Sequence, residues 1–190
     1  MNEQQLKENL AQMLINSGCN VFLDRGNGFP TFKGKKKLKS LKKPDLIVFL
    51  KNGNGYVTNP FGVEVKLGDS YGKHINQVIE QMRNYKTEPS YIIDGETYNL
   101  KTLFLTTKPA IFENVIYKGS SSFPFTFKTE AQKAIEWAIV RQLFSLTSAT
   151  NEKLYFGLLK KDFWGFYLAF PNFIYRIENG NLEKRWTWSE

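Results

Sequence analysis

Two acidic residues and a lysine stand out in this sequence because they interrupt runs that otherwise have the composition of buried strands. Asp45 comes directly before the apolar run 46–50, and Glu64 and Lys66 lie inside the apolar run 61–68. Burying a charged group without a partner is costly, so such residues are expected only where they have partners or a chemical task. These three positions are therefore the first candidates for a functional site.

The segment between the two runs predicts that they form a β-hairpin. It is rich in Asn-Gly pairs, which are the strongest short-range hairpin signal. With Asn54-Gly55 as the centre of the turn, residues whose numbers sum to 109 face each other, and Asp45 lies opposite Glu64. Strand alternation places Glu64 and Lys66 on one face, while the intervening valines turn to the core.

This arrangement brings two carboxylates close to a lysine. Carboxylates held close repel each other, and burying both is costly unless a cation lies between them. Mg²⁺ prefers carboxylate oxygens and keeps open positions for water and phosphate. A nearby lysine adds positive charge for an attacking hydroxide or a phosphorane-like transition state.

The segments Pro44-Asp45 and Glu64-Val65-Lys66 resemble the PD-(D/E)XK nuclease superfamily, which includes many restriction endonucleases, Holliday junction resolvases and repair exonucleases. The resemblance covers about residues 2–107. It implies a restriction endonuclease-like mixed β-sheet flanked by helices. It also implies that Asp45 and Glu64 bind Mg²⁺, or Mn²⁺ in its place, together with the carbonyl of Val65, and that Lys66 positions or activates the water.

Further site residues follow from the same resemblance. Many members add an acid from the first helix, for which Glu8 is the better candidate and Glu3 the alternative. Some members carry a glutamine in the helix after the lysine strand, often as Gln-x-x-x-Tyr. Here Gln81 and Tyr85 have that spacing, and Gln77 lies one turn earlier on a similar face.

Two other interpretations of the motif stay open. In the first, Asp45 only caps a strand, and Glu64 and Lys66 form a surface pair. In the second, the chain is a degenerate family member that binds without cutting, although the intact set of Asp, Glu and Lys argues against it.

The charge distribution favours a polyanionic partner. The formal net charge is +8 and the pI is about 9.4. Positive charge is concentrated in the basic run, residues 33–43, which contains no acid and favours DNA through counterion release. A solvated loop or a targeting signal is the alternative. The lysines of the basic run are Lys33, Lys35, Lys36, Lys37, Lys39, Lys42 and Lys43.

Hydrophobic spacing and turn signals predict the elements that position these residues. The order is helix, strands, helix, strand, helix and a C-terminal β-ribbon, and this predicts an α/β or α+β domain with a mixed sheet. The expected helices are 2–18, 70–86 and 129–146, and the expected strands include 20–26, 90–94 and 100–107, the last in the middle of the sheet.

The composition changes near residue 151. Residues 1–150 form the predicted nuclease-like core, and 151–190 form an aromatic-rich antiparallel β extension packed on the core or at a dimer interface. Core packing is the preferred interpretation of its aromatics, with base stacking and a homodimer interface as alternatives. They include Phe163, Trp164, Phe166, Tyr167, Phe170, Trp186 and Trp188.

Several function classes lack support in the sequence. The lone Cys19 is expected to be a small core residue, and the lone His74 leaves zinc and Ser-His-Asp chemistry without ligands or partners. No nucleotide-binding glycine motif occurs. No apolar run approaches the roughly 20 residues needed to span a bilayer, so we expect no membrane partner and a cytoplasmic, reducing location.

Together these observations predict a metal-dependent DNA nuclease, with an endonuclease as the preferred interpretation and an exonuclease as the open alternative. The alternative function is a non-catalytic nucleic-acid-binding module that uses the basic run and the aromatic C-terminal segment.

Overall fold

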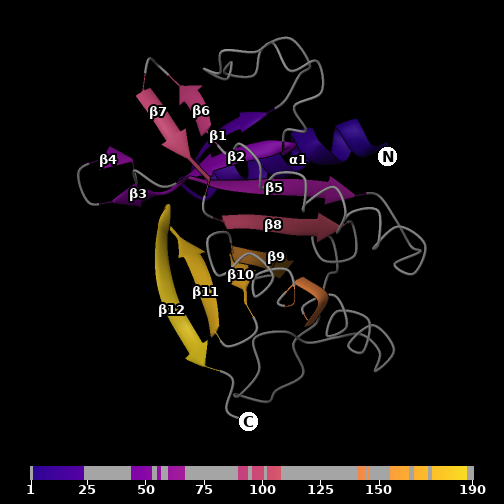
Figure 1. The fold of residues 1–190 in the computed structure, drawn as a ribbon, viewed down its shortest axis with the longest axis vertical. Coiled ribbons are helices and arrows are strands. Elements are labelled where there is room, and N and C mark those ends of the chain that lie inside the picture. The colour runs from indigo at the N-terminus through magenta and orange to yellow at the C-terminus, as the bar shows by residue number, and fades with distance from the viewer. Residues whose placement is uncertain are drawn as a thin grey trace.

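The fold was obtained as a computed structural model and is centred on one large sheet (Figure 1). The structure describes residues 2–23, 44–52, 55–56, 60–66, 90–93, 96–100, 102–107, 141–143, 145, 155–162, 165–170 and 173–187. Within these ranges the elements are helix α1 (Glu3–Asn16) and strands β1 (Asn20–Leu23), β2 (Leu46–Phe49), β3 (Lys51–Asn52), β4 (Gly55–Tyr56), β5 (Phe61–Lys66), β6 (Ser90–Ile93), β7 (Glu96–Asn99), β8 (Thr102–Thr107), β9 (Tyr155–Asp162), β10 (Gly165–Ala169), β11 (Phe173–Glu178) and β12 (Asn181–Thr187).

The large sheet has eight strands in the order β1-β2-β5-β8-β9-β10-β11-β12. It is mixed, because β5 pairs with β8 in parallel and β8 pairs with β9 in parallel, whereas the other neighbours are antiparallel. β3-β4 and β6-β7 form separate two-stranded sheets. The sheet curls in Figure 1. A mixed sheet combined with helix α1 is compatible with the predicted α+β class.

Helix α1 forms where hydrophobic spacing predicted it. Its N-terminus has a capping box, in which the Asn2 side chain accepts a hydrogen bond from the Gln5 amide and the Gln5 side chain accepts one from the Asn2 amide. The helix ends at Asn16 and is followed by Gly18 at φ +89°, a conformation that favours glycine.

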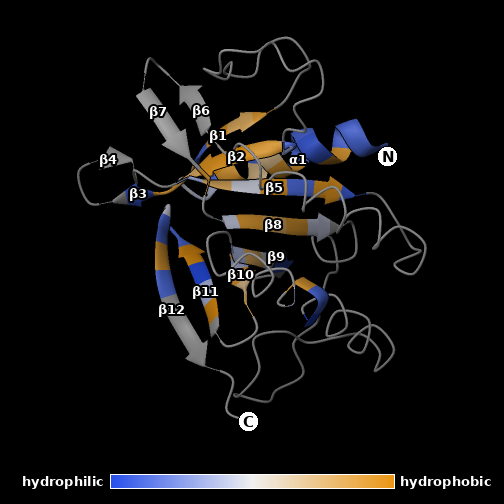
Figure 2. Cartoon of the chain, in the orientation of Figure 1, coloured by the Kyte–Doolittle hydropathy of each residue, from blue (hydrophilic) through white to orange (hydrophobic). Residues whose placement is uncertain are grey.

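The core lies between α1 and the sheet. Leu6, Leu10 and Leu14, spaced four residues apart, are fully buried on one side of α1. One hydrophobic cluster joins them to β2 and β5 and also to Phe166 of β10 and Ile177 of β11, so strands from both halves of the sheet share one core with the helix. Figure 2 shows the contrast between β2, whose residues are hydrophobic, and α1, in which hydrophilic and hydrophobic residues alternate along the ribbon.

The C-terminal strands continue the large sheet. β9 to β12 form the expected antiparallel series, and β9 joins this series to β8, so these four strands share the sheet of the N-terminal elements. The preferred interpretation of the aromatics is confirmed for Phe166, Tyr167 and Phe170, which are buried. The side chains of Phe163, Trp164, Trp186 and Trp188 are outside the described part of the chain.

The turn between β11 and β12 contacts the turn after α1. Asn179 and Gly180 both have positive φ, as an Asn-Gly hairpin turn requires. A Cβ atom on Gly18 would lie 2.8 Å from the backbone of both residues. The Gly180 carbonyl also accepts a hydrogen bond of 2.7 Å from the Lys51 amide, so this turn fastens three segments that are far apart in sequence.

Two predicted helices lie entirely or mostly outside the described residues. The helix predicted at 70–86 lies outside the described residues, and of the helix predicted at 129–146 only 141–143 and 145 are described, all as helix. Among the described residues, no helix combines the length and apolar character needed to cross a membrane.

Candidate metal and phosphate site

The hairpin that carries the predicted site has the predicted register. In the ladder between β2 and β5, Leu46 pairs with Val63 and Val48 pairs with Phe61, which are pairs whose numbers sum to 109. The predicted centre of the turn was wrong by one residue, because Asn52 pairs with Gly55 at the tip. Between the pair Asn52–Gly55 and the pair Val48–Phe61, the segment leading to β5 has two more residues than the segment following β2. These two extra residues restore the predicted register.

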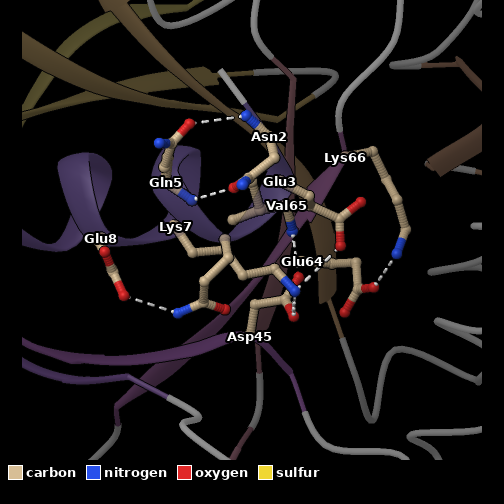
Figure 3. Close-up of polar contacts among 10 residues, drawn as sticks. Asn2, Glu3, Gln5, Lys7, Glu8, Asp45, Glu64, Val65 and Lys66 are labelled. Carbon is tan, nitrogen blue, oxygen red and sulfur yellow. Dashed lines mark hydrogen bonds and ion pairs between the residues drawn. The ribbon is translucent and has the colours of Figure 1, made fainter.

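Asp45 lies at the end of this ladder, where it bonds to β5 through its side chain. Its Oδ2 accepts a hydrogen bond of 2.7 Å from the backbone amide of Val65 (Figure 3). The carboxylate is thereby tied to the residue between Glu64 and Lys66. In a strand the N–H and C=O of one residue point to the same side, so the Val65 carbonyl also lies on the Asp45 side of β5.

Glu64 and Lys66 form an ion pair on one face of β5. Lys66 Nζ lies 2.6 Å from Glu64 Oε1, as expected for residues two apart in a strand. The Glu64 side chain is only 1% exposed, whereas that of Lys66 is 25% exposed. A carboxylate this deeply buried depends on its cation, and the pair is therefore more than a surface contact.

The ion pairs around Asp45 and Glu64 form a charged cluster of five residues, Glu3, Lys7, Asp45, Glu64 and Lys66. Lys7 of α1 is the member that the sequence did not predict. Its Nζ lies 2.6 Å from Asp45 Oδ1 and 3.0 Å from Glu3 Oε1. The Glu3–Lys7 spacing of four residues predicts a helical ion pair, which could have drawn attention to Lys7. The contact with Asp45 joins two distant parts of the sequence, and no local pattern predicts it.

The two acids proposed from the first helix have different surroundings. Glu8 is exposed, and its Oε1 accepts a hydrogen bond of 2.9 Å from Gln4. Glu3 shares Lys7 with Asp45 (Figure 3). The structure thus brings the alternative, Glu3, to the cluster, while the preferred candidate Glu8 is held in a separate exposed contact.

Burial and charge act in opposite directions on Asp45 and Lys7. Burial raises the pKa of Asp45 above its ordinary value, even though Lys7, the Val65 amide and Lys66 each act to lower it. Burial by itself lowers the pKa of Lys7, but its ion pairs with Asp45 and Glu3 outweigh burial and raise it. Lys66, which forms the ion pair with Glu64, is thus also close enough to act on the charge of Asp45.

The donor set suits a hard divalent cation. Asp45, Glu64 and the Val65 carbonyl offer oxygens, and the three carboxylates of the cluster outnumber its two ammonium groups, which leaves a net charge of −1. Among the described residues, no group of three His, Cys, Asp or Glu side chains lies close enough to hold a metal. A metal here would therefore depend on two carboxylates, the backbone carbonyl and outside ligands such as water and phosphate.

The remaining predicted residues are not placed. Gln77, Gln81, Tyr85 and all seven lysines of the basic run lie outside the described residues, as does His74. Their predicted roles therefore stay predictions.

Comparison with known proteins gives no family assignment. No family model, curated protein or solved structure matches this chain.

Proposed function

We propose that this chain is a Mg²⁺-dependent nuclease of the PD-(D/E)XK type that hydrolyses phosphodiester bonds in DNA, acting as an endonuclease with a restriction endonuclease-like core. The observation that carries the proposal is the hydrogen bond from the Val65 amide to Asp45. It joins Asp45 to the segment that holds Glu64 and Lys66, three residue types that phosphodiester hydrolysis can use together.

Asp45, Glu64 and the Val65 carbonyl would hold the metal. A bound Mg²⁺ supplies positive charge to a phosphate oxygen and lowers the pKa of a bound water. Lys66, 2.6 Å from Glu64, carries an ammonium group beside the same carboxylates and would orient the attacking water. Glu3 approaches the cluster through Lys7 and is the acid of α1 that we include in the site.

The order of the described elements supports this proposal. α1 is followed by β1 and by the hairpin of β2 and β5, and β8 then pairs with β5 in parallel. Parallel strands end at the same edge of a sheet, so a substrate at the end of β5 would also meet the end of β8. This edge is where Lys66 ends its strand.

Charge supports DNA as the substrate. A chain with net charge +8 and seven lysines in the basic run is suited to a polyanion, and contacts with phosphate give affinity without reading sequence. The lysines of the basic run would bind backbone phosphates and bring DNA to the carboxylates.

A second candidate function is a nucleic-acid-binding module without catalysis. The observation that favours it is that Asp45 and Glu64 each already have a lysine within 2.6 Å. Such a cluster can stabilise the fold as a set of ion pairs, and the basic run would then bind DNA by itself.

A cleavage assay separates the two functions. Purified protein is incubated with supercoiled plasmid, linear duplex, single strands and a four-way junction in Mg²⁺ or Mn²⁺. Asp45→Asn preserves the shape of the side chain and removes its charge, and we expect it to lower the cleavage rate by about 100-fold or more. Glu183→Gln, which changes an exposed carboxylate on the far edge strand, is the matched control and should keep the full rate.

The outcomes have distinct meanings. Cleavage that persists in both Asp45→Asn and Lys66→Ala would show that the site lies elsewhere. Binding of DNA without cleavage in either metal would favour the binding module.

A further inference from the structure

We propose that Lys7 competes with the metal for the Asp45 carboxylate. The Lys7 ammonium group pairs with Asp45 in the metal-free protein and moves to Glu3 when a divalent cation binds. The inference rests on the proposed metal site and assigns a regulatory role to a residue outside the predicted motif. Lys7 is treated as a positioning residue, because its contacts are with Asp45 and Glu3.

Both oxygens of Asp45 have donors. Oδ1 lies 2.6 Å from Lys7 Nζ, and Oδ2 accepts the 2.7 Å hydrogen bond from the Val65 amide. A metal that binds through Asp45 must therefore share an oxygen with one of these donors or displace it. Since like charges repel, sharing Oδ1 with an ammonium group at this distance is unfavourable.

Lys7 is the donor that can leave. The Val65 amide belongs to β5, which pairs with β2 over its first three residues and with β8 over its whole length, so it cannot shift without breaking the sheet. The Lys7 ammonium is at the end of a flexible four-carbon stem. The end of this side chain can move while α1 stays in place.

Glu3 gives the displaced ammonium a second partner. It lies one helical turn before Lys7, and its Oε1 is already 3.0 Å from Nζ. The Glu3 side chain is 41% exposed, so a lysine that moves toward it also moves toward water. Lys7 would thus keep an ion pair in both states, and the cost of releasing Asp45 would be small.

The test measures the affinity of the 190-residue chain for Mn²⁺ alone. Calorimetry gives this affinity, as does the electron paramagnetic resonance spectrum of free Mn²⁺. Lys7→Met keeps the length of the side chain and removes the charge. We expect it to bind Mn²⁺ roughly tenfold more tightly, since one nearby opposite charge shifts a carboxylate's affinity for a cation by about that much. We also expect the metal-free variant to melt at a lower temperature, because Asp45 loses its partner.

Two variants serve as controls. Lys7→Arg restores the charge and should return the affinity toward that of the wild type. Lys51→Met removes an exposed lysine of β3, just beyond the end of β2 that is far from Asp45 and about 20 Å from it by strand length, and should leave the affinity unchanged.

Glu3→Gln tests the second partner and does not depend on Lys7→Met being stable. We expect it to weaken Mn²⁺ binding several-fold when Lys7 is present, because the ammonium then stays on Asp45, and to have no effect in the Lys7→Met background. An equal loss in both backgrounds would make Glu3 a direct ligand and overturn its role as the second partner.

The results also separate this inference from the proposed function. If Asp45→Asn abolishes Mn²⁺ binding while Lys7→Met leaves the affinity unchanged or weaker, the metal site stands and the competitor role is overturned. If the wild type does not bind Mn²⁺, or if Asp45→Asn binds it normally, the metal site itself is overturned together with the inference.

Discussion

The ion pairs of the cluster differ in what they contribute, because their side chains differ in burial. The Glu64 side chain is 1% exposed, and removing the cation beside such a carboxylate costs about 3–5 kcal/mol. The Glu3–Lys7 pair is partly exposed and of the helical type that contributes about 0.5 kcal/mol or less. A loss of activity in Lys66→Ala can therefore reflect unfolding, which makes Asp45→Asn the more informative variant.

Cys19 provides a residue-scale prediction that depends on pH. It is the only cysteine, it is buried, and burial raises its pKa to about 11, although Lys51 lowers it in part. Because the pKa is higher in the folded protein, the stability that this thiol contributes is present below its unfolded pKa, about 8.5, and is lost as pH rises toward 11. We expect native protein at pH 8 to react with iodoacetamide much more slowly than protein in urea.

Mass spectrometry checks this prediction, since a single label is possible. The native rate should rise steeply between about pH 9 and pH 11, whereas the unfolded rate should level off near its lower pKa. Equal rates for native and unfolded protein at pH 8 would contradict the burial of Cys19 in the core.

At the scale of elements, the first turn of α1 determines where Glu3 and Lys7 lie. The capping box of Asn2 and Gln5 fixes this turn through hydrogen bonds of 2.8 and 2.9 Å. Helix α1 then places Lys7 over Asp45, while its leucines pack on β2 and β5. The geometry of the cluster thus depends on a helix cap that contains none of its charges.

Replacing the cap tests this dependence. Asn2→Ala should lower the free energy of unfolding by about 1 kcal/mol, because one amide of the first turn loses its acceptor. Urea denaturation measures the change. Gln12→Ala, on the exposed side of α1, should stay within about 0.5 kcal/mol of the wild type. An unchanged stability in Asn2→Ala would mean that packing alone holds the first turn.

Local pattern accounts for much of the fold and for part of the site. Hydrophobic spacing predicted α1, β2, β5 and β8, and the Asn-Gly signal predicted a hairpin whose register was right although its turn was centred one residue earlier. Asp45, Glu64 and Lys66 could be singled out because charges interrupt apolar runs. These signals are local, so a single sequence is sufficient to find them.

Two features could not be found in this way. The parallel pairing of β8 with β9 joins segments that are far apart in sequence. Parallel strands are not joined by a tight turn, so no turn motif predicts this pairing. Lys7 lies in an ordinary amphipathic helix, where a lysine needs no explanation. Its contact with Asp45 arises only after α1 has packed on the sheet, so it depends on tertiary structure.

At the scale of the whole molecule, the eight strands and α1 form one unit in which the last hairpin of the chain contacts the turn between α1 and β1. The sheet begins at β1 and ends at β12, and the turn between β11 and β12 contacts Gly18, just after α1. The Lys51 amide bonds to the same turn. Stability in the N-terminal and C-terminal halves should therefore be coupled.

Gly18→Ala tests this coupling. Gly18 has φ +89°, and its added Cβ would lie 2.8 Å from the backbone of Asn179 and Gly180. Left-handed strain and the clash together should lower the free energy of unfolding by about 2 kcal/mol or more. Asn179→Gly keeps the backbone of the same contact and should change stability by less than about 0.5 kcal/mol. A neutral Gly18→Ala would show that the two turns separate without cost.

The contact between these turns also has a consequence for synthesis of the protein. A ribosome makes the cluster residues, which lie between Glu3 and Lys66, well before it makes Asn179 and Gly180. The nascent chain therefore carries every charge of the cluster before it contains the turn between β11 and β12, which packs against Gly18 just after α1. A fragment that stops before β11 would keep the whole motif but would lack this contact and the buried Ile177, so the packing around α1 would be complete only after β11 and β12 have been made.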